Sequence, residues 1–86
     1  MRTAEFGTWI SALARAAGYD IDGPRSGGKK ELAEASGISQ SSIGRILAGK
    51  IMPSPYSLED LALALNVPVL DMLVAAEVIS RKAATS

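Results

Sequence analysis

The sequence predicts an all-α fold, a compact domain of five short helices around one hydrophobic core. Three observations support this prediction. Five segments place apolar residues three and four positions apart, the spacing of a single helix face. Stretches rich in Gly, Pro and Ser separate these segments. No segment alternates apolar and polar residues as a half-buried strand does, so no β-sheet is expected.

The first predicted helix spans residues 4–17, and Gly18 is a natural helix end. Its apolar face predicts that Trp9 belongs to the core rather than stacking on a nucleotide base. Residues 19–28 contain three Gly and one Pro and are therefore predicted to form a loop. The core-facing positions of this helix are Phe6, Trp9, Ile10, Leu13, Ala14 and Ala17.

Two short helices are predicted next, over residues 29–36 and 40–48. Gly37 permits a left-handed conformation at the end of the first of these helices, and Ser39 is a good N-cap for the second. Such a pair forms a helix-turn-helix, whose second helix protrudes and fits the major groove of B-DNA. The expected buried residues of the pair are Leu32, Ala33, Ile38, Ile43, Ile46 and Leu47.

The C-terminal half predicts two more helices. Pro53 and Pro55 argue against a helix throughout residues 50–56, and Ser57 begins a capping signal that ends at Asp60. The fourth helix is expected to bury Leu58, Leu61, Ala62 and Leu65 and to end at Asn66. Pro68 opens a fifth helix, which runs to the high 70s. Residues 1–79 are thus predicted to be one domain, followed by a flexible tail over 80–86.

Composition narrows the classes of protein that the chain can represent. The chain has 86 residues, enough for one small domain, and it contains neither Cys nor His. It therefore lacks thiolate metal ligands and the commonest general base. Residues 27–30 also lack the spacing of a phosphate-binding P-loop. No enzyme activity, cofactor, metal or small-molecule ligand is expected. Without a membrane span or signal peptide, a cytoplasmic protein is predicted.

The helix-turn-helix region resembles the XRE family, also called λ-repressor/Cro-like helix-turn-helix domains. The motifs that carry the resemblance are Leu32-Ala33-Glu34, Gly37-Ile38-Ser39-Gln40-Ser41-Ser42-Ile43, Ala48-Gly49-Lys50 and Leu58…Leu61-Ala62…Leu65-Asn66-Val67. The resemblance implies a λ-repressor-like DNA-binding domain with its helix-turn-helix at residues 29–48. It further implies that double-stranded operator DNA is bound, usually by a dimer.

Residue roles follow from this resemblance by position. In the family the first residues of the recognition helix meet base edges; here these are Gln40, Ser41 and Ser42, and Gly44 and Arg45 one turn later are further candidates for base contact. The predicted phosphate contacts are Lys29, Lys30, Ser39, Lys50 and, on the lengthened loop 19–28, Arg25. Gln can bind adenine through two hydrogen bonds. Family members often carry Gln where this chain has Lys29, so a Gln-to-Gln bridge between the two helices is not expected.

Several of these roles have structural alternatives. Gly44 either lets DNA approach closely or avoids a clash with the protein itself. Lys29 and Lys30 bind phosphate or are simply solvated, and Arg45 contacts DNA or faces solvent. Loop 19–28 either carries Arg25 as an arm toward DNA or is a lengthened loop without a role.

The fifth predicted helix has apolar residues on two sides. Val69, Met72, Leu73 and Ala76 are expected to face the core. A second stripe, formed by Leu70, Val74 and Val78, predicts a homodimer interface, and a dimer implies a palindromic operator. The alternative is a larger intramolecular core that includes the first helix.

Charge is segregated along the chain although it sums to zero. Residues 24–52 carry Arg25, Lys29, Lys30, Arg45 and Lys50 against Glu31 and Glu34, a net charge of +3. Residues 53–79 carry Glu59, Asp60, Asp71 and Glu77 without a cation, a net charge of −4. A basic helix-turn-helix can contact several phosphates, and the acidic half is expected to face away from DNA.

Taken together, these features predict a sequence-specific DNA-binding transcriptional regulator associated with the nucleoid. The preferred hypothesis is a small dimeric repressor, either a phage immunity repressor or Cro-like protein or a small host regulator. One alternative is the DNA-binding antitoxin of a toxin–antitoxin pair. Another is a protein-interaction adaptor of the same fold, which the near-neutral charge favours.

Overall fold

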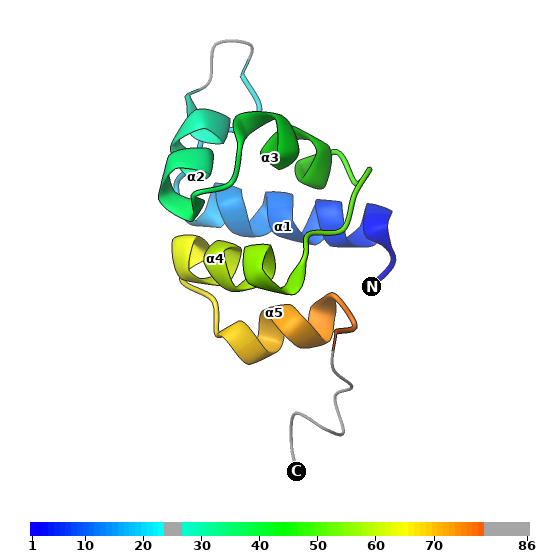
Figure 1. Cartoon of the computed structure of the whole chain (residues 1–86). Coiled ribbons are helices and arrows are strands. Elements are labelled where there is room, and N and C mark those ends of the chain that lie inside the picture. Colours follow the sequence, from blue (N-terminus) through cyan, green and yellow to red (C-terminus); the bar gives the residue numbers. More distant parts are fainter. Residues whose placement is uncertain (24–26, 79–86) are drawn as a thin grey trace.

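A computed structural model describes residues 1–23 and 27–78 and shows five α-helices in those residues, with no strand (Figure 1). The helices are α1 (Thr3–Ala16), α2 (Gly28–Ser36), α3 (Gln40–Leu47), α4 (Pro55–Leu65) and α5 (Val69–Ala75). The predicted all-α fold is therefore confirmed. The tail predicted over 80–86 lies outside the described residues.

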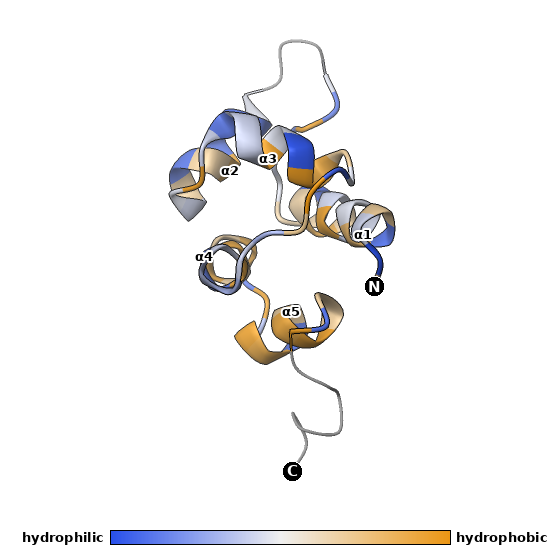
Figure 2. Cartoon of the chain, turned by 45° about the vertical axis from the view of Figure 1, so that its right-hand side comes forward, coloured by the Kyte–Doolittle hydropathy of each residue, from blue (hydrophilic) through white to orange (hydrophobic). Residues whose placement is uncertain are grey.

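The helices are arranged with the helix-turn-helix at one end and α5 at the other. Both ribbon views place α2 and α3 together, α1 and α4 in the middle, and α5 beyond α4 (Figures 1 and 2). The packed pairs are α2 with α3, α1 with α3, α2 with α4, and α4 with α5. The helix-turn-helix is thus supported by α1 and α4, while α5 packs on α4.

One core joins all five helices, and most of its members are those that helical spacing predicted. Ala17 is an exception, because α1 ends at Ala16 and Ala17 is exposed, and the buried Ile21 of the following loop was not predicted. Phe6, Ile10, Leu32, Ile43, Ile46, Leu58, Leu61 and Met72 have essentially no exposed surface. Burying one such side chain contributes about 1.5–3 kcal/mol. Trp9 is half-buried against this core, and its ring centroid lies 5.8 Å from that of Phe6. Trp9 is therefore a packing residue, as predicted.

The start of α4 differs from the prediction. Ser54, not Ser57, is the N-cap: its Oγ accepts a hydrogen bond from the Ser57 backbone N–H at 3.3 Å. Pro55 occupies the first helical turn, where a missing N–H has no cost and a fixed φ favours the helix. The prediction was wrong because it treated Pro55 as a helix breaker, whereas at this position proline starts the helix.

The position of this cap has a testable consequence. Replacing Ser54 by alanine is expected to lower the free energy of unfolding by about 1 kcal/mol, because the Ser57 N–H loses its partner. Ser57→Ala is the matched control, since the Ser57 side chain caps no backbone group among the described residues, and it should change stability much less. Urea denaturation of both variants measures the difference. Equal losses would contradict the assignment of the cap to Ser54.

The helix α5 is shorter than predicted and ends at Ala75. Glu77 adopts a left-handed backbone with φ of 62°, and the Val78 N–H bonds back to the Leu73 carbonyl at 2.9 Å. The Met1 amino group also donates to the Ala75 carbonyl at 2.8 Å. Val78 therefore follows the helix in its closing turn, and the stripe predicted through Leu70, Val74 and Val78 is not continuous on one helix.

Candidate nucleic-acid interface

The turn between α2 and α3 is built by three adjacent residues. Gly37 has φ of 73°, a conformation that side-chain-bearing residues rarely adopt, and its N–H bonds to the Ala33 carbonyl. The buried Ser36 hydroxyl donates to the Leu32 carbonyl at 2.7 Å and accepts the Ile38 N–H at 3.3 Å. Ile38 is half-buried against the core. The turn is thus held by backbone, hydroxyl and apolar contacts together.

The N-terminus of α3 carries the predicted Ser39 cap. The Ser39 Oγ accepts the Ser42 backbone N–H at 3.2 Å and donates to the Ser42 Oγ at 2.9 Å. The predicted cap is therefore confirmed. The two hydroxyls share one proton between them, which leaves the other proton available for an outside acceptor.

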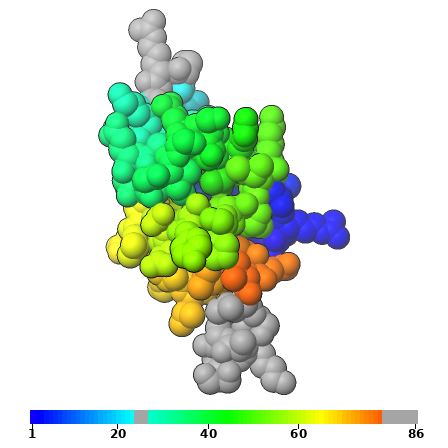
Figure 3. All heavy atoms as spheres, viewed as in Figure 1, coloured from blue at the N-terminus to red at the C-terminus, as the bar shows by residue number. Residues whose placement is uncertain are grey.

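The outer face of α3 carries the residues predicted to contact bases. Gln40, Ser41 and Arg45 are exposed, while Ser42 and Gly44 are partly exposed. The opposite face buries Ile43 and Ile46, and α3 lies at the surface of the molecule in the space-filling view (Figure 3). Gln40, Ser41 and Ser42 thus share the first turn of the helix, with Gly44 and Arg45 one turn further on.

Open space surrounds Gly44. Apart from its own helix, a Cβ placed there would meet no atom within 4 Å among the described residues. The alternative that Gly44 avoids a clash within the protein is therefore wrong for this part of the chain. An alanine would also favour the helix by up to about 1 kcal/mol, so glycine here is not explained by folding.

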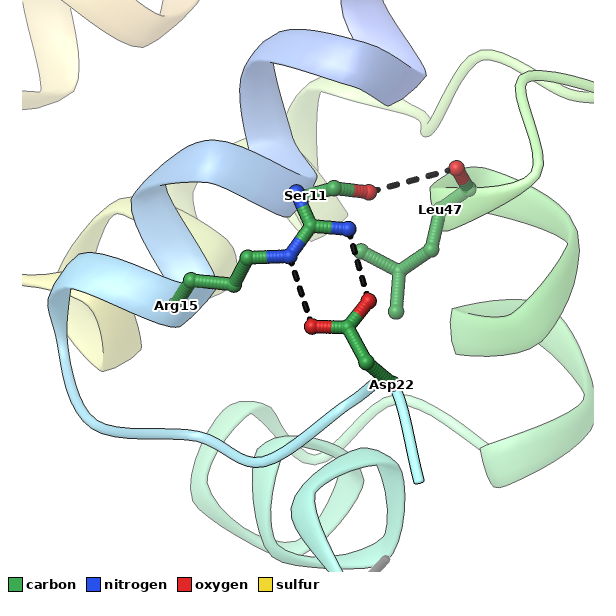
Figure 4. Close-up of polar contacts among 4 residues, drawn as sticks. All are labelled: Ser11, Arg15, Asp22 and Leu47. Atoms are coloured by element: carbon green, nitrogen blue, oxygen red, sulfur yellow. Dashed lines mark hydrogen bonds and ion pairs between the residues drawn. The ribbon is translucent and has the colours of Figure 1, made fainter. Parts of the chain in front are cut away.

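The C-terminal end of α3 is closed by backbone hydrogen bonds and by α1. The Lys50 N–H bonds to the Arg45 carbonyl at 2.9 Å and the Gly49 N–H bonds to the Ile46 carbonyl at 3.0 Å, the two bonds of a Schellman motif. The Leu47 carbonyl receives the hydroxyl of Ser11, from α1, at 3.3 Å (Figure 4). Three of the last carbonyls of α3 are therefore satisfied, one of them across the helix interface.

The predicted phosphate contacts are distributed over two helix ends. Lys29 and Lys30 occupy the first turn of α2, where Lys30 is exposed and Lys29 is half-buried. The positive end of the helix dipole disfavours cations at a helix N-terminus. A phosphate bound there would attract both lysines and the backbone N–H groups of α2. Lys50 is exposed just after α3. Arg25 lies outside the described residues.

An ion pair ties the loop that precedes α2 to α1. Arg15 binds both carboxylate oxygens of Asp22, at 2.7 and 2.8 Å (Figure 4). The hydrogen bond from Arg15 lowers the pKa of Asp22 from its ordinary value of 3.8, and it raises the pKa of Arg15 in turn. Because the pKa of Asp22 is lowered by folding, this pair stabilises the fold above pH 3.8 and ceases to do so as pH falls through the lowered value.

The predicted dimer residues lie at the other end of the molecule. Leu70 is 55% exposed and Val78 is 44% exposed, while Val74 is half-buried. The alternative of a larger intramolecular core is therefore wrong for Leu70 and Val78. In contrast, Met72 is fully buried, as the prediction for the core-facing stripe requires.

Two contacts from α1 to the helix-turn-helix were not predicted from the sequence. Gly7 and Ser11 are buried, and both touch the C-terminal end of α3. Their spacing, together with Ala4 and Ala14, places small residues along one face of α1 and was the available signal. That pattern shows a face suited to close packing, but it does not show which element packs there.

Two kinds of structural feature are absent from residues 1–23 and 27–78. None of their helices combines the length and hydropathy needed to cross a membrane. No cluster of acidic side chains there is suited to hold a metal ion.

The geometry defines a helix-turn-helix protein, with a left-handed Gly37 between two helices and an exposed second helix. The model of a helix-turn-helix family matches residues 29–72, just over half of the chain. The chain therefore belongs to the helix-turn-helix family of the XRE kind, a family of DNA-binding domains. No curated protein and no solved structure matches the chain significantly.

Proposed function

We propose that the chain is a small sequence-specific transcriptional regulator, a repressor that binds a palindromic operator as a homodimer. In this proposal α3 lies in the major groove and the protein is associated with the nucleoid. The observation that carries the proposal is the exposure of Gln40 and Ser41 at the N-terminal turn of α3. That turn is the part of a recognition helix that meets base edges in helix-turn-helix proteins.

Side-chain chemistry supports direct reading of bases by this turn. The Gln40 amide carries both a donor and an acceptor and can match the N6 and N7 atoms of adenine. The hydroxyls of Ser41 and Ser42 can serve either donors or acceptors. Gly44 leaves the helix backbone uncovered on the same outer face, so that face can approach the groove closely.

Charge around the same helices supports contacts to the DNA backbone. Lys30, Arg45 and Lys50 are exposed on or beside α2 and α3. Phosphate contacts of this kind position the protein, while base contacts specify the sequence. With few cations per subunit, we expect modest non-specific affinity and a gain in useful affinity from dimerisation.

The proposal is tested by selecting bound duplexes from a random DNA pool at several salt concentrations. We expect enrichment of an inverted repeat whose half-sites are about one helical turn, ~34 Å, apart. Binding should weaken steeply as salt rises, because phosphate contacts release counterions. A pool without enrichment, or binding that salt does not change, would favour the protein-interaction adaptor instead.

Gly44 offers a sharper test of close approach. Gly44→Ala is expected to stabilise the free protein by up to about 1 kcal/mol, because alanine favours the helix and meets no neighbour. The same methyl group would stand between the helix and the bases. We therefore expect operator affinity to fall by about tenfold, or 1.4 kcal/mol. Urea denaturation and fluorescence anisotropy measure the two effects.

Ala48→Gly is a suitable companion variant, because Ala48 is exposed at the cap position of α3, beyond the predicted base contacts. It should change operator affinity little. If Gly44→Ala stabilises the fold and leaves affinity unchanged, Gly44 does not lie at the DNA interface.

A further inference from the structure

The backbones of α1 and α3 approach each other unusually closely where α3 ends. A Cβ on Gly7 would lie 2.6 Å from the Gly49 backbone nitrogen, 2.7 Å from its Cα and 2.8 Å from the Ile46 carbonyl oxygen. All three neighbours are backbone atoms, which cannot move aside as a flexible side chain can. Gly7 therefore permits a separation between α1 and the end of α3 that no other residue would.

Gly49 meets α1 from the other side of the same contact. Its φ of 75° is left-handed, and a Cβ on Gly49 would lie 2.8 Å from the Ala4 Cα. Gly49 also ends α3 through the Schellman motif. The residue that terminates α3 is thus the same residue that packs on α1, so the end of the helix and its distance from α1 are set together.

Ser11 adds a directional hydrogen bond to the contact between α1 and α3. It is 7% exposed, and its hydroxyl donates to the Leu47 carbonyl, which Figure 4 shows at the end of α3. A carbonyl in the last turn of a helix lacks an intrahelical partner. The Ser11 hydroxyl supplies one, and because hydrogen bonds weaken away from linear geometry, it resists movement of α3 relative to α1.

We infer that Gly7 and Ser11 of α1 are positioning residues for DNA recognition: they set the orientation of α3 and thereby its preference among bases. The inference rests on the proposed function. Both residues are buried, so neither contacts DNA itself. Their effect reaches the operator through the angle at which α3 presents Gln40 and Gly44.

The test compares variants that loosen this contact with variants that do not. Ser11→Ala removes the bond to Leu47, and Gly7→Ala forces the two backbones apart. Thr8→Ala is the matched control, because among the described residues its hydroxyl bonds to the Ala4 carbonyl alone, within α1 and also at 3.3 Å. Leu65→Ala controls for lost stability, because it opens the core at α4 rather than at α3.

Two readouts separate orientation from stability. Residual dipolar couplings of backbone amides report the angle between α3 and α1 in the free protein. The ratio of affinities for the selected operator and its single-base variants reports specificity. Lost stability lowers the folded fraction for every DNA alike and leaves this ratio unchanged, whereas a reoriented helix changes it.

We expect Ser11→Ala to reorient α3 and to change the affinity ratio by about fivefold or more, within the range of one base contact. Thr8→Ala and Leu65→Ala should retain the wild-type ratio and couplings. If Gly7→Ala does not fold, Ser11→Ala carries the test alone.

A wild-type helix angle or affinity ratio in folded Ser11→Ala would overturn the inference. A wild-type protein that prefers no DNA sequence would instead remove the proposed function, and with it the role in base preference. The dipolar couplings would still decide whether Ser11 orients α3.

Discussion

Leu70→Glu is expected to give a folded monomer that binds its operator at least about 100-fold more weakly than the wild-type protein does. Leu70 is 55% exposed on α5 and lies outside the core, so the charge should not unfold the protein. At a dimer interface the same charge would be buried without a partner, which is strongly unfavourable. Losing the second half-site removes an avidity gain of about 10²–10⁴.

Analytical ultracentrifugation and anisotropy with the selected operator measure the two effects. Leu63→Glu is the matched control, because Leu63 is 70% exposed on α4 and does not belong to the predicted interface. It should keep the oligomeric state and most of the affinity. A wild-type protein that sediments as a monomer at high concentration would contradict the dimer. A stronger effect from Leu63→Glu would place the interface on α4.

Gln40→Ala is expected to weaken binding to the operator by about 1–3 kcal/mol and to relax the preference at one base pair. The reason is that an exposed amide in the first turn of α3 is lost while the Ser39 cap and the buried Ile43 remain. Anisotropy titrations with the operator and with its three variants at that base pair measure both effects.

Lys50→Ala provides the contrast for this experiment. A cation that contacts phosphate contributes equally to all sequences, so its loss should weaken every duplex alike and reduce the salt slope by about one unit. Should Gln40→Ala behave in this uniform way, Gln40 would contact the DNA backbone rather than a base.

Local features were predictable because each depends on residues close together in the sequence. Gly37 and Asn66 end their helices in left-handed conformations, and Ser39 caps α3, all within a few residues of the groups they serve. The two errors at helix ends were also local. Pro55 starts α4 where a break was expected, and Glu77 adopts a left-handed backbone that is uncommon for a residue with a side chain.

Contacts between residues far apart in the sequence could not be predicted from these local patterns. The Ser11 hydroxyl reaches a carbonyl 36 positions away, and the Tyr19 hydroxyl reaches the Ala64 carbonyl 45 positions away. Helical spacing shows that Ser11 shares a face with Gly7, but it does not show which helix covers that face. Likewise, no pattern distinguishes a glycine that avoids a clash from one that leaves open space, as Gly7 and Gly44 respectively do.

The pattern of residues thus settles the five-helix fold, the helix-turn-helix and the family, because helical periodicity and turn chemistry act over a few positions. The tertiary packing alone settles how α3 is held, since the close contact of Gly7 with Gly49 and the bond from Ser11 to Leu47 exist only when α1 and α3 meet. Which side chains a recognition helix carries is a property of the sequence. The angle at which it carries them is a property of the assembled core.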